Sequence, residues 1–267
     1  MRILGRMQRG LSLIEMLIAL GIAAIVIAGV YRSFAVQQKN FVIQEQVAEA
    51  QQNVRSVMDL IARDIRVAGF GRPSWAVGGF AESVNLPGNP SNQVTVVGVF
   101  GPPIAALQND STMGMDQLIL DQNVDLTAGD NLLVFEPDTI AAPLRYRTVV
   151  VWNDAAATNT IDIDSEGDTP GTRETLDMTL RATAQVYKVE TITYALNGTT
   201  LTRDGNVLAT SVTNFQITDQ YNPAVPDTFG RYQIVMAVTT RTSDPDFPGG
   251  FRTRTLTSTI KARNLSL

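Results

Sequence analysis

Glu15 is the residue whose type and position point most clearly to chemistry, because it is the single ionisable side chain in the apolar stretch Leu11–Val30. An acidic side chain inside a membrane span costs roughly 2.5–3.5 kcal/mol on translocon scales and indicates a function by default. Its partner has to be a cation, yet the stretch contains no Lys, Arg or His. A cut after Gly10 would create one, the α-amino group of Leu11. In a stack of such chains, this amine could pair with the Glu15 carboxylate of a neighbour.

A second group of residues has the spacing of a metal site. The run Asp162–Asp168 alternates oxygen ligands and places Gly167 at its sixth position, as a calcium loop does. The candidate calcium ligands are Asp162, Asp164, Glu166 and Asp168. The twelfth position, where such a loop has a bidentate carboxylate, holds Arg173. A solvated acidic turn between two strands is therefore the interpretation that we favour.

The composition excludes most catalytic sites. The chain has no histidine and no cysteine, which removes Ser-His-Asp triads, cysteine nucleophiles and the usual zinc sets. Neither a glycine-rich phosphate loop nor a nucleophile elbow is present. Carboxylate pairs, Ser-Lys pairs and oxygen-ligand metals remain open. We expect no catalytic residues, no resident cofactor and no enzyme activity.

Length and charge indicate a folded protein that does not bind nucleic acid. With 267 residues, 44% hydrophobic and 18% charged, the chain can bury a substantial core. Its formal charge of −5 becomes −8 if a cut after Gly10 removes Arg2, Arg6 and Arg9. A mildly acidic protein is a poor ligand for nucleic acid.

The apolar stretch is long enough to cross a membrane. Twenty helical residues reach about 30 Å, one hydrocarbon thickness. Three arginines precede the stretch, whereas Arg32 and Lys39 follow it, so the leader should stay cytoplasmic while the rest crosses. A secretory signal peptide and a plain single-span anchor are the alternatives. The run is longer than a signal-peptide core, and no clear Ala-x-Ala site follows it.

The helical pattern continues beyond the span to Ala68 without proline or glycine. Its apolar face is expected to contain Phe34, Phe41, Val47, Val54, Met58, Ile61, Ile65 and Ala68. Arg55, Asp59 and Arg63 mark the solvated face, and Gly69 supplies a C-terminal stop. The sequence thus predicts one helix from Leu11 to Ala68, about 87 Å long.

From Gly71 onward, short β-branched runs between proline and glycine predict strands. The expected strands are Gln93–Phe100, Gln117–Leu120, Asn131–Glu136, Leu144–Trp152, Thr160–Ile163, Gln185–Leu196, Thr200–Arg203, Phe215–Thr218, Tyr232–Arg241 and Arg252–Ala262. Asn197-Gly198 is the strongest hairpin signal, and Asp204-Gly205 is a second tight turn. The fold class is therefore α+β, a long helical spine packed on a β-rich head.

The junction Gly10-Leu11-Ser12-Leu13-Ile14-Glu15 resembles the class III leader of type IV pilins and type II secretion pseudopilins. In that family a prepilin peptidase cuts after the glycine, the new N-terminus is methylated, and the glutamate five residues in guides subunit docking. The resemblance implies these roles for Gly10, Leu11 and Glu15. Leu11 departs from the commoner phenylalanine, and Arg32 stands where many major pilins have proline.

Short segments further along resemble a narrower group, the PilW-like minor pilins, which are related to the J-type pseudopilins. The segments are Asp64–Phe70, Met115–Leu118, Ile192–Tyr194, Leu201–Arg203, Ser211–Phe215 and Arg263–Leu265. Each is weak alone, and together they occur in the expected order over most of the chain.

The resemblance implies a lollipop-shaped minor pilin. Its expected parts are a cleaved leader (1–10), a transmembrane and assembly half of the spine (11–30), an amphipathic half (31–69) and a head (70–267). The subunit would wait in the inner membrane with a periplasmic head, then join an extracellular pilus near its tip. Because a topmost subunit can lack the glutamate, Glu15 implies a place beneath another subunit. Implied partners are other minor pilins, the major pilin, a tip adhesin, prepilin peptidase and the assembly platform.

Three other functions stay open at this point. A J-type pseudopilin of type II secretion would share the leader and spine, although this head is long for one. A pilus-tip adhesive subunit would use the exposed loops of the head. A membrane-tethered enzyme would need a carboxylate constellation that a sequence does not reveal. Some pseudopilins bind calcium in the head, so the resemblance also keeps the acidic run as a candidate site.

Overall fold

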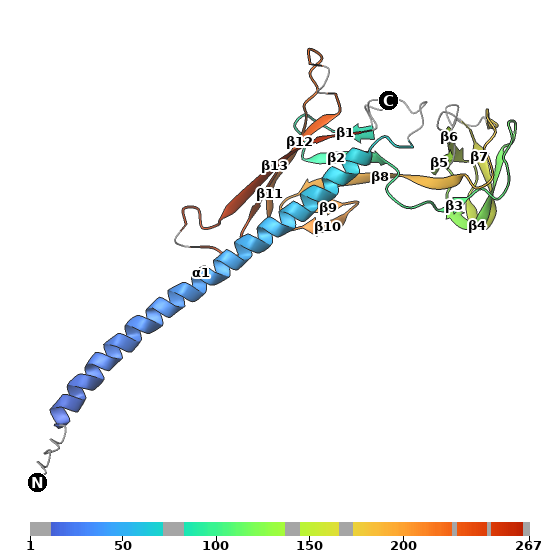
Figure 1. The fold of residues 1–267 in the computed structure, drawn as a ribbon. Helices are drawn as coiled ribbons and strands as arrows, with labels where there is room; N and C mark the ends of the chain where they lie inside the picture. The colour runs from blue at the N-terminus through green and yellow to red at the C-terminus, as the bar shows by residue number, and fades with distance from the viewer. Residues whose placement is uncertain are drawn as a thin grey trace, which may run out of the picture. The chain divides into compact units, whose positions relative to one another are not determined.

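The computed structural model describes residues 12–71, 83–136, 145–165, 173–225, 229–244 and 247–263. The fold is α+β: one long helix, α1 (Leu13–Val67), is followed in these described parts by thirteen strands (Figure 1). The chain forms two compact units, residues 1–49 with 240–252 and residues 50–239 with 253–267. Helix α1 is continuous through both units. The fold class predicted from the sequence is confirmed.

Both ends of α1 follow local sequence signals. The backbone amide of Met16 donates to the carbonyl of Ser12 at 3.1 Å, which makes Ser12 the N-cap. At the other end Gly69 adopts a φ of +87°, a left-handed conformation that favours glycine and stops the helix. The Gly69 amide then bonds the Val97 carbonyl at 2.9 Å. The helix predicted over 11–68 is confirmed in its described part.

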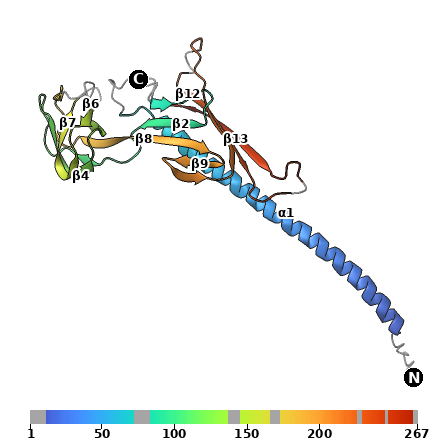
Figure 2. The same cartoon turned by 180° about the vertical axis from the view of Figure 1, so that it is seen from behind.

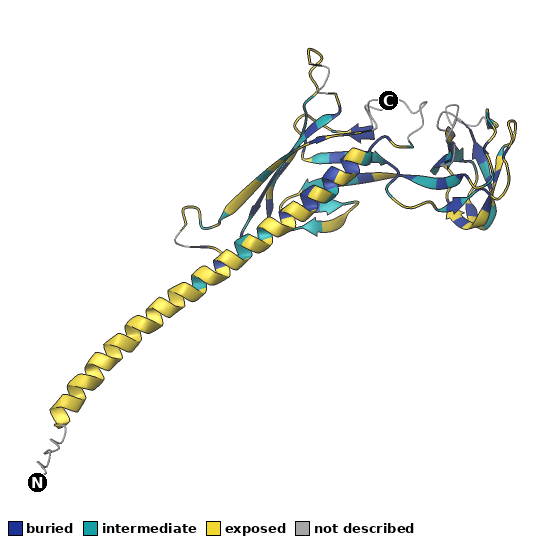
Figure 3. Cartoon of the chain, viewed as in Figure 1, coloured by how far each residue is buried: buried dark blue, intermediate teal, exposed yellow. Residues whose placement is uncertain are grey.

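The unit of residues 1–49 and 240–252 is largely exposed helix. Every described residue from Ser12 to Gln38 is exposed, as the yellow part of α1 shows (Figure 3). Phe34 and Phe41, two members of the predicted apolar face, are 61% and 67% exposed.

The second unit has a core formed by the C-terminal half of α1 and two sets of strands. The first set comprises β1 (Val84–Asn85), β2 (Gln93–Gly98), the end of β8 (Gln185–Asn197), β9 (Thr200–Arg203) and β10 (Asn206–Ala209). The second is a three-stranded antiparallel sheet of β11 (Val212–Asp219), β12 (Arg231–Thr239) and β13 (Thr253–Lys261). The helix contributes Val54, Val57, Met58, Ile61, Ala62 and Ile65 to this core, and Ala68 follows directly after it. The C-terminal part of the predicted apolar face is thus confirmed.

A separate core lies among the other strands of the same unit. They are β3 (Ala105–Ala106), β4 (Gln117–Leu126), β5 (Asn131–Glu136), β6 (Arg145–Val151) and β7 (Ala155–Asp164). Strand β8 belongs to both cores, as Figure 2 shows: Lys188 pairs with Leu132 of β5, and Tyr194 pairs with Val94 of β2. Its 13 residues are therefore the main connection between the two parts of the head.

The observed strands match the ten predicted ones with shifted ends. Strand β4 extends to Leu126 and β7 begins at Ala155, because register shifts between them interrupt the alternation that the prediction used. The short strands β1 and β3, and β10, were not predicted. Asn197 pairs with Thr200, so the first hairpin turns at Gly198-Thr199, one residue later than expected. Asp204 and Gly205, with φ of 50° and 80°, form the second predicted turn.

Candidate assembly site

Glu15 lies in the first turn of α1, three residues after the N-cap Ser12. Its backbone amide bonds the Ser12 carbonyl at 3.0 Å. A carboxylate in the first turn is stabilised by the helix dipole, by about 0.3–1 kcal/mol at exposed sites. The spacing Ser12-x-x-Glu15 is that of a capping box, a signal that our interpretation of Glu15 as a docking group overlooked. The helix dipole therefore gives Glu15 a local stabilising role besides any role between subunits.

The side chains around Glu15 are apolar on all sides of the helix. More than half of the surface of Leu13, Ile14 and Leu17 is exposed. None of the most apolar 18-residue window of α1 is buried, and by length and composition this helix could cross a membrane. Signal sequences share that property, so membrane topology stays a prediction. An apolar surface of this extent needs lipid or another protein to cover it.

The residues predicted for processing precede the start of α1. Gly10 and Leu11 both lie outside the described residues. Cleavage between them and methylation of Leu11 therefore stay predictions.

A buried polar cluster, which the sequence did not reveal, fixes α1 to the head. The Asp64 side chain is 1% exposed, and its Oδ2 accepts hydrogen bonds from Tyr194 Oη at 2.6 Å and Arg203 Nη2 at 3.3 Å. Burial and the hydrogen bond to Asp64 raise the pKa of Tyr194 above its usual value, so the hydroxyl stays a donor. The sequence contains one indication of this cluster: the carboxylate of Asp64 lies between the core positions Ile61 and Ile65 of the helix.

The cluster unites three of the short segments that were singled out in the sequence. Asp64 comes from α1, Tyr194 from β8 and Arg203 from β9, where the sequence shows Asp64–Phe70, Ile192–Tyr194 and Leu201–Arg203. Segments that are weak signals one by one thus meet at one point of the core.

The candidate calcium ligands are described only in part. Asp162 accepts hydrogen bonds from Gln117 at 2.8 Å, Asn153 at 3.1 Å and Arg173 at 3.1 Å. The bonds from Gln117 and Asn153, with the Arg173 charge, hold the pKa of the Asp162 carboxyl below its ordinary value. Asp164 is buried and accepts the Glu174 amide at 3.1 Å.

The other two candidate ligands, Glu166 and Asp168, lie outside the described residues. Within the described part of the chain, no three metal-binding side chains converge. Arg173, at the twelfth loop position, instead forms ion pairs with Asp162 and Asp116. Calcium binding therefore stays a prediction.

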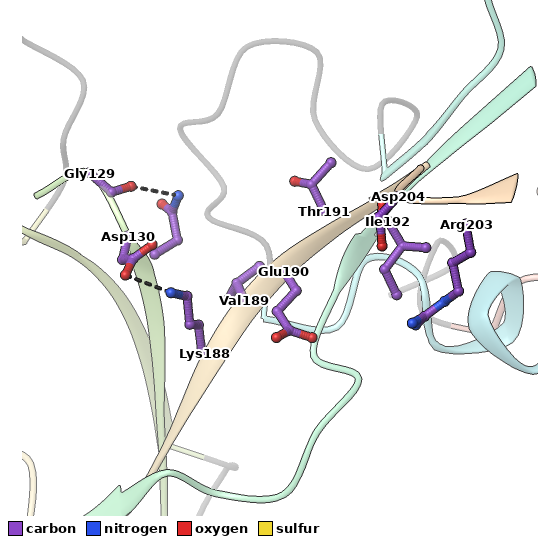
Figure 4. Close-up of a pocket in the computed structure, with 10 residues that line it drawn as sticks. Gly129, Asp130, Lys188, Val189, Glu190, Thr191, Ile192, Arg203 and Asp204 are labelled. Carbon is purple, nitrogen blue, oxygen red and sulfur yellow. Dashed lines mark hydrogen bonds and ion pairs between the residues drawn. The ribbon is translucent and has the colours of Figure 1, made fainter. Parts of the chain in front are cut away.

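The head also has an open polar hollow of about 470 Å³ beside β8 (Figure 4). Lys188 Nζ and Asp130 Oδ2 form an ion pair across part of it at 2.7 Å. The Asp204 carboxylate, at its other end, accepts the Thr193 amide at 2.7 Å. These charged groups bond to their neighbours, and none is arranged as a nucleophile beside a base.

Comparison with known proteins gives one match. Residues 5–31 match the family described as the prokaryotic N-terminal methylation motif, a span that includes Gly10, Leu11 and Glu15. No curated protein matches the chain. The match indicates a leader for prepilin peptidase and a structural subunit that assembles with other pilins in a pilus or a secretion system. By this motif and its long apolar helix, the chain is similar to type IV pilin-like proteins that are anchored in a membrane.

Proposed function

We propose that the protein is a minor pilin of the PilW-like type, which primes or joins pilus assembly near the tip. The observation that carries the proposal is the exposed apolar part of α1 with the Glu15 carboxylate in its first turn. The helix would pack into the fibre, and Glu15 would pair with the N-terminal amine of a neighbouring subunit. The protein would act in assembly and would catalyse no reaction.

The physical argument concerns what a helix gains when it leaves lipid for a fibre. Lipid tails are as apolar as leucine, so burial of apolar area contributes little to this transfer. Close packing and the neutralisation of Glu15 remain as driving forces. Pairing removes much of the cost of a carboxylate in an apolar medium, which favours subunits in the correct axial register.

Processing and location follow from the same proposal. Prepilin peptidase would cut between Gly10 and Leu11, and Leu11 would be N-methylated. The subunit would lie in the inner membrane with a periplasmic head before it enters the extracellular pilus. Its partners would be other minor pilins, the major pilin, a tip adhesin and the assembly platform.

The test of processing is the intact mass of the chain after co-expression with prepilin peptidase. We expect a chain that begins at Leu11 and carries one added methyl group. A Gly10→Val variant is the matched control and should stay uncut. An uncut native chain, or cleavage beyond Val30, would contradict the proposal. Incorporation into pili, measured with Glu15 variants, then tests docking.

A further inference from the structure

The polar hollow beside β8 lies where the sheet is interrupted (Figure 4). On this side of β8, Val189 pairs with Asn131 at the start of β5. Further along, Tyr194 pairs with Arg203 at the end of β9. Residues 190–193 of β8 lie between these pairs, and within the described part of the chain no strand pairs with them on this side. The hollow is therefore a gap between two strands that both run antiparallel to β8.

The backbone of Thr191 faces this gap. Backbone groups of an antiparallel strand alternate between its two sides. On the β2 side, the Leu196 amide donates to the Asn92 carbonyl at 3.1 Å. On the side of the gap, the Thr193 carbonyl accepts the Asp204 amide at 2.8 Å. The N–H and C=O groups of residues 191 and 193 therefore point toward the gap.

These two residues differ in what they bond. Thr193 is satisfied by Asp204, whose Oδ1 also accepts the Thr193 amide at 2.7 Å. Thr191 lies opposite Val97 without hydrogen bonds to it, because the Val97 carbonyl turns away and accepts the Gly69 amide at 2.9 Å. Among the described residues, none bonds the backbone N–H or C=O of Thr191, which is exposed. One donor and one acceptor of the strand are thus open to a ligand.

Glu190 gives the gap its preference for charge. The two cations that line the hollow are already paired, Lys188 with Asp130 at 2.7 Å and Arg203 with Asp64 at 3.3 Å. The Glu190 carboxylate is exposed, and no described residue forms a hydrogen bond or ion pair with it. A basic side chain directly across the strand would stabilise the pairing, whereas an acidic one would oppose it.

The geometry of the gap defines the length and register of a ligand. A residue opposite Thr191 would exchange both backbone hydrogen bonds with it. In an antiparallel segment, the next residue would lie opposite Glu190, with its side chain on the same face of the sheet. A segment longer than about three residues would collide with β5 at one end and with Asp204 at the other.

We propose that this gap binds an extended segment of a partner protein, about three residues long, with a lysine or arginine as its third residue opposite Glu190. Peptides commonly bind by adding a strand to an open edge of a sheet, through backbone hydrogen bonds. The contact belongs to the head and uses neither the leader nor Glu15. Its failure would therefore leave the assembly proposal unaffected.

The direct test is a titration of the full chain in detergent with the blocked tripeptide acetyl-Val-Thr-Lys-amide, followed by nuclear magnetic resonance. We expect slower amide exchange at Thr191 and no change at Ile192, whose backbone faces β2. The matched peptide acetyl-Val-Thr-Glu-amide should bind about fivefold or more weakly, because it places like charges opposite each other. Equal binding of the two peptides, or an unchanged Thr191 amide, would overturn the proposal.

Variants of Glu190 test the charge. Glu190→Gln should bring the affinities of the two peptides close together, and Glu190→Lys should reverse their order. Glu45→Gln, which changes an exposed carboxylate of α1, is the matched control and should leave both affinities unchanged. An unaltered preference for the lysine peptide in the Glu190 variants contradicts the proposed register.

Variants of Thr191 test the backbone pairing. Thr191→Pro removes the N–H that faces the gap and should abolish binding, whereas Thr191→Val should retain it. If Thr191→Pro fails to fold, butylamine decides, because it carries the ammonium group of lysine without a peptide backbone. Binding of butylamine as tight as that of the tripeptide would make the gap a simple cation site and overturn strand pairing; much weaker binding supports it.

Discussion

Glu15 meets two demands at once, since it lies in the first turn of its own helix and in the surface that would face a neighbour. The two roles make different predictions for substitution. Capping depends on Ser12 as much as on Glu15 and acts within one subunit. Pairing depends on the negative charge and acts between subunits.

We predict that Glu15→Gln leaves cleavage intact and lowers incorporation into pili. A hydrogen bond to a charged group contributes about 1.5–3 kcal/mol, so the loss should be roughly tenfold to a hundredfold. Incorporation is measured by immunoblotting of sheared pili against the membrane fraction.

Two controls separate the roles of Glu15. Ser12→Ala weakens the cap by about 0.5–2 kcal/mol and keeps the carboxylate, so incorporation should stay near normal. Glu45→Gln removes an exposed carboxylate of the same helix and should have no effect. Normal incorporation of Glu15→Gln would refute the docking role.

Asp64 shows how a single carboxylate can connect a helix to a sheet. Its partners Tyr194 and Arg203 are 130 and 139 residues away in the chain. We predict that Tyr194→Phe lowers the free energy of unfolding by about 1.5–3 kcal/mol, because it removes a bond to a buried charge. Asp64→Ala should cost about 3 kcal/mol, the low end for a broken buried pair, since the Arg203 side chain is one-third exposed.

The measurement is urea unfolding of the full chain in detergent, followed by tryptophan fluorescence or circular dichroism. Asp59→Ala is the matched control, because Asp59 lies on the exposed face of the same helix. Its effect should stay within about 0.5 kcal/mol. Equal stability of the Asp59 and Asp64 variants would show that the cluster contributes nothing.

At the scale of elements, the sequence predicted the features that depend on residues close together in the chain. The apolar periodicity predicted α1, and Gly69 predicted its end. The tight turn after β9 was predicted from Asp204-Gly205, and both residues adopt positive φ. Each of these depends on residues within a few positions of one another.

Features that depend on distant partners were not predicted. Nothing in the local pattern of β8 showed that its two halves serve two cores, because its partners β5 and β2 come from separate parts of the chain. Phe34 and Phe41 fit the apolar periodicity as well as Ile61 does. Periodicity identifies a face of a helix and does not show what covers it.

The turn after α1 offers a test of packing against a small apolar cluster of the head, Val99, Leu133 and Val189. Gly71 has a φ of +79°, and a Cβ there would lie 2.9 Å from Val99 Cγ2 and 3.1 Å from Leu133 Cβ. We predict that Gly71→Ala destabilises the head by about 1–3 kcal/mol, through overpacking and left-handed strain. Thermal unfolding measures the loss. Gly101→Ala, with open space around its Cβ and no positive φ, should be near neutral. A neutral Gly71→Ala would show that this junction adapts freely.

At the scale of the whole molecule, the proposed function takes the chain through two environments. The same surface of α1 that would face lipid would later face other helices, which explains why it is apolar on all sides and charged only at Glu15. The head does not have to suit two environments, and it buries its own apolar cores.

We expect the leader to set the direction in which the chain would cross the membrane. We predict that replacing Arg2, Arg6 and Arg9 together by asparagine reduces export of the head severalfold, because the cytoplasmic side of the span then loses its excess of positive charge. An alkaline phosphatase fused after the head reports export. Replacing Arg32 and Lys39 is the matched control, and it should leave export unchanged or raise it, since it removes positive charge from the opposite side of the span. If the leader variant exports the head as well as the native chain does, the leader arginines do not set the topology, and the orientation must come from the assembly machinery that receives the helix.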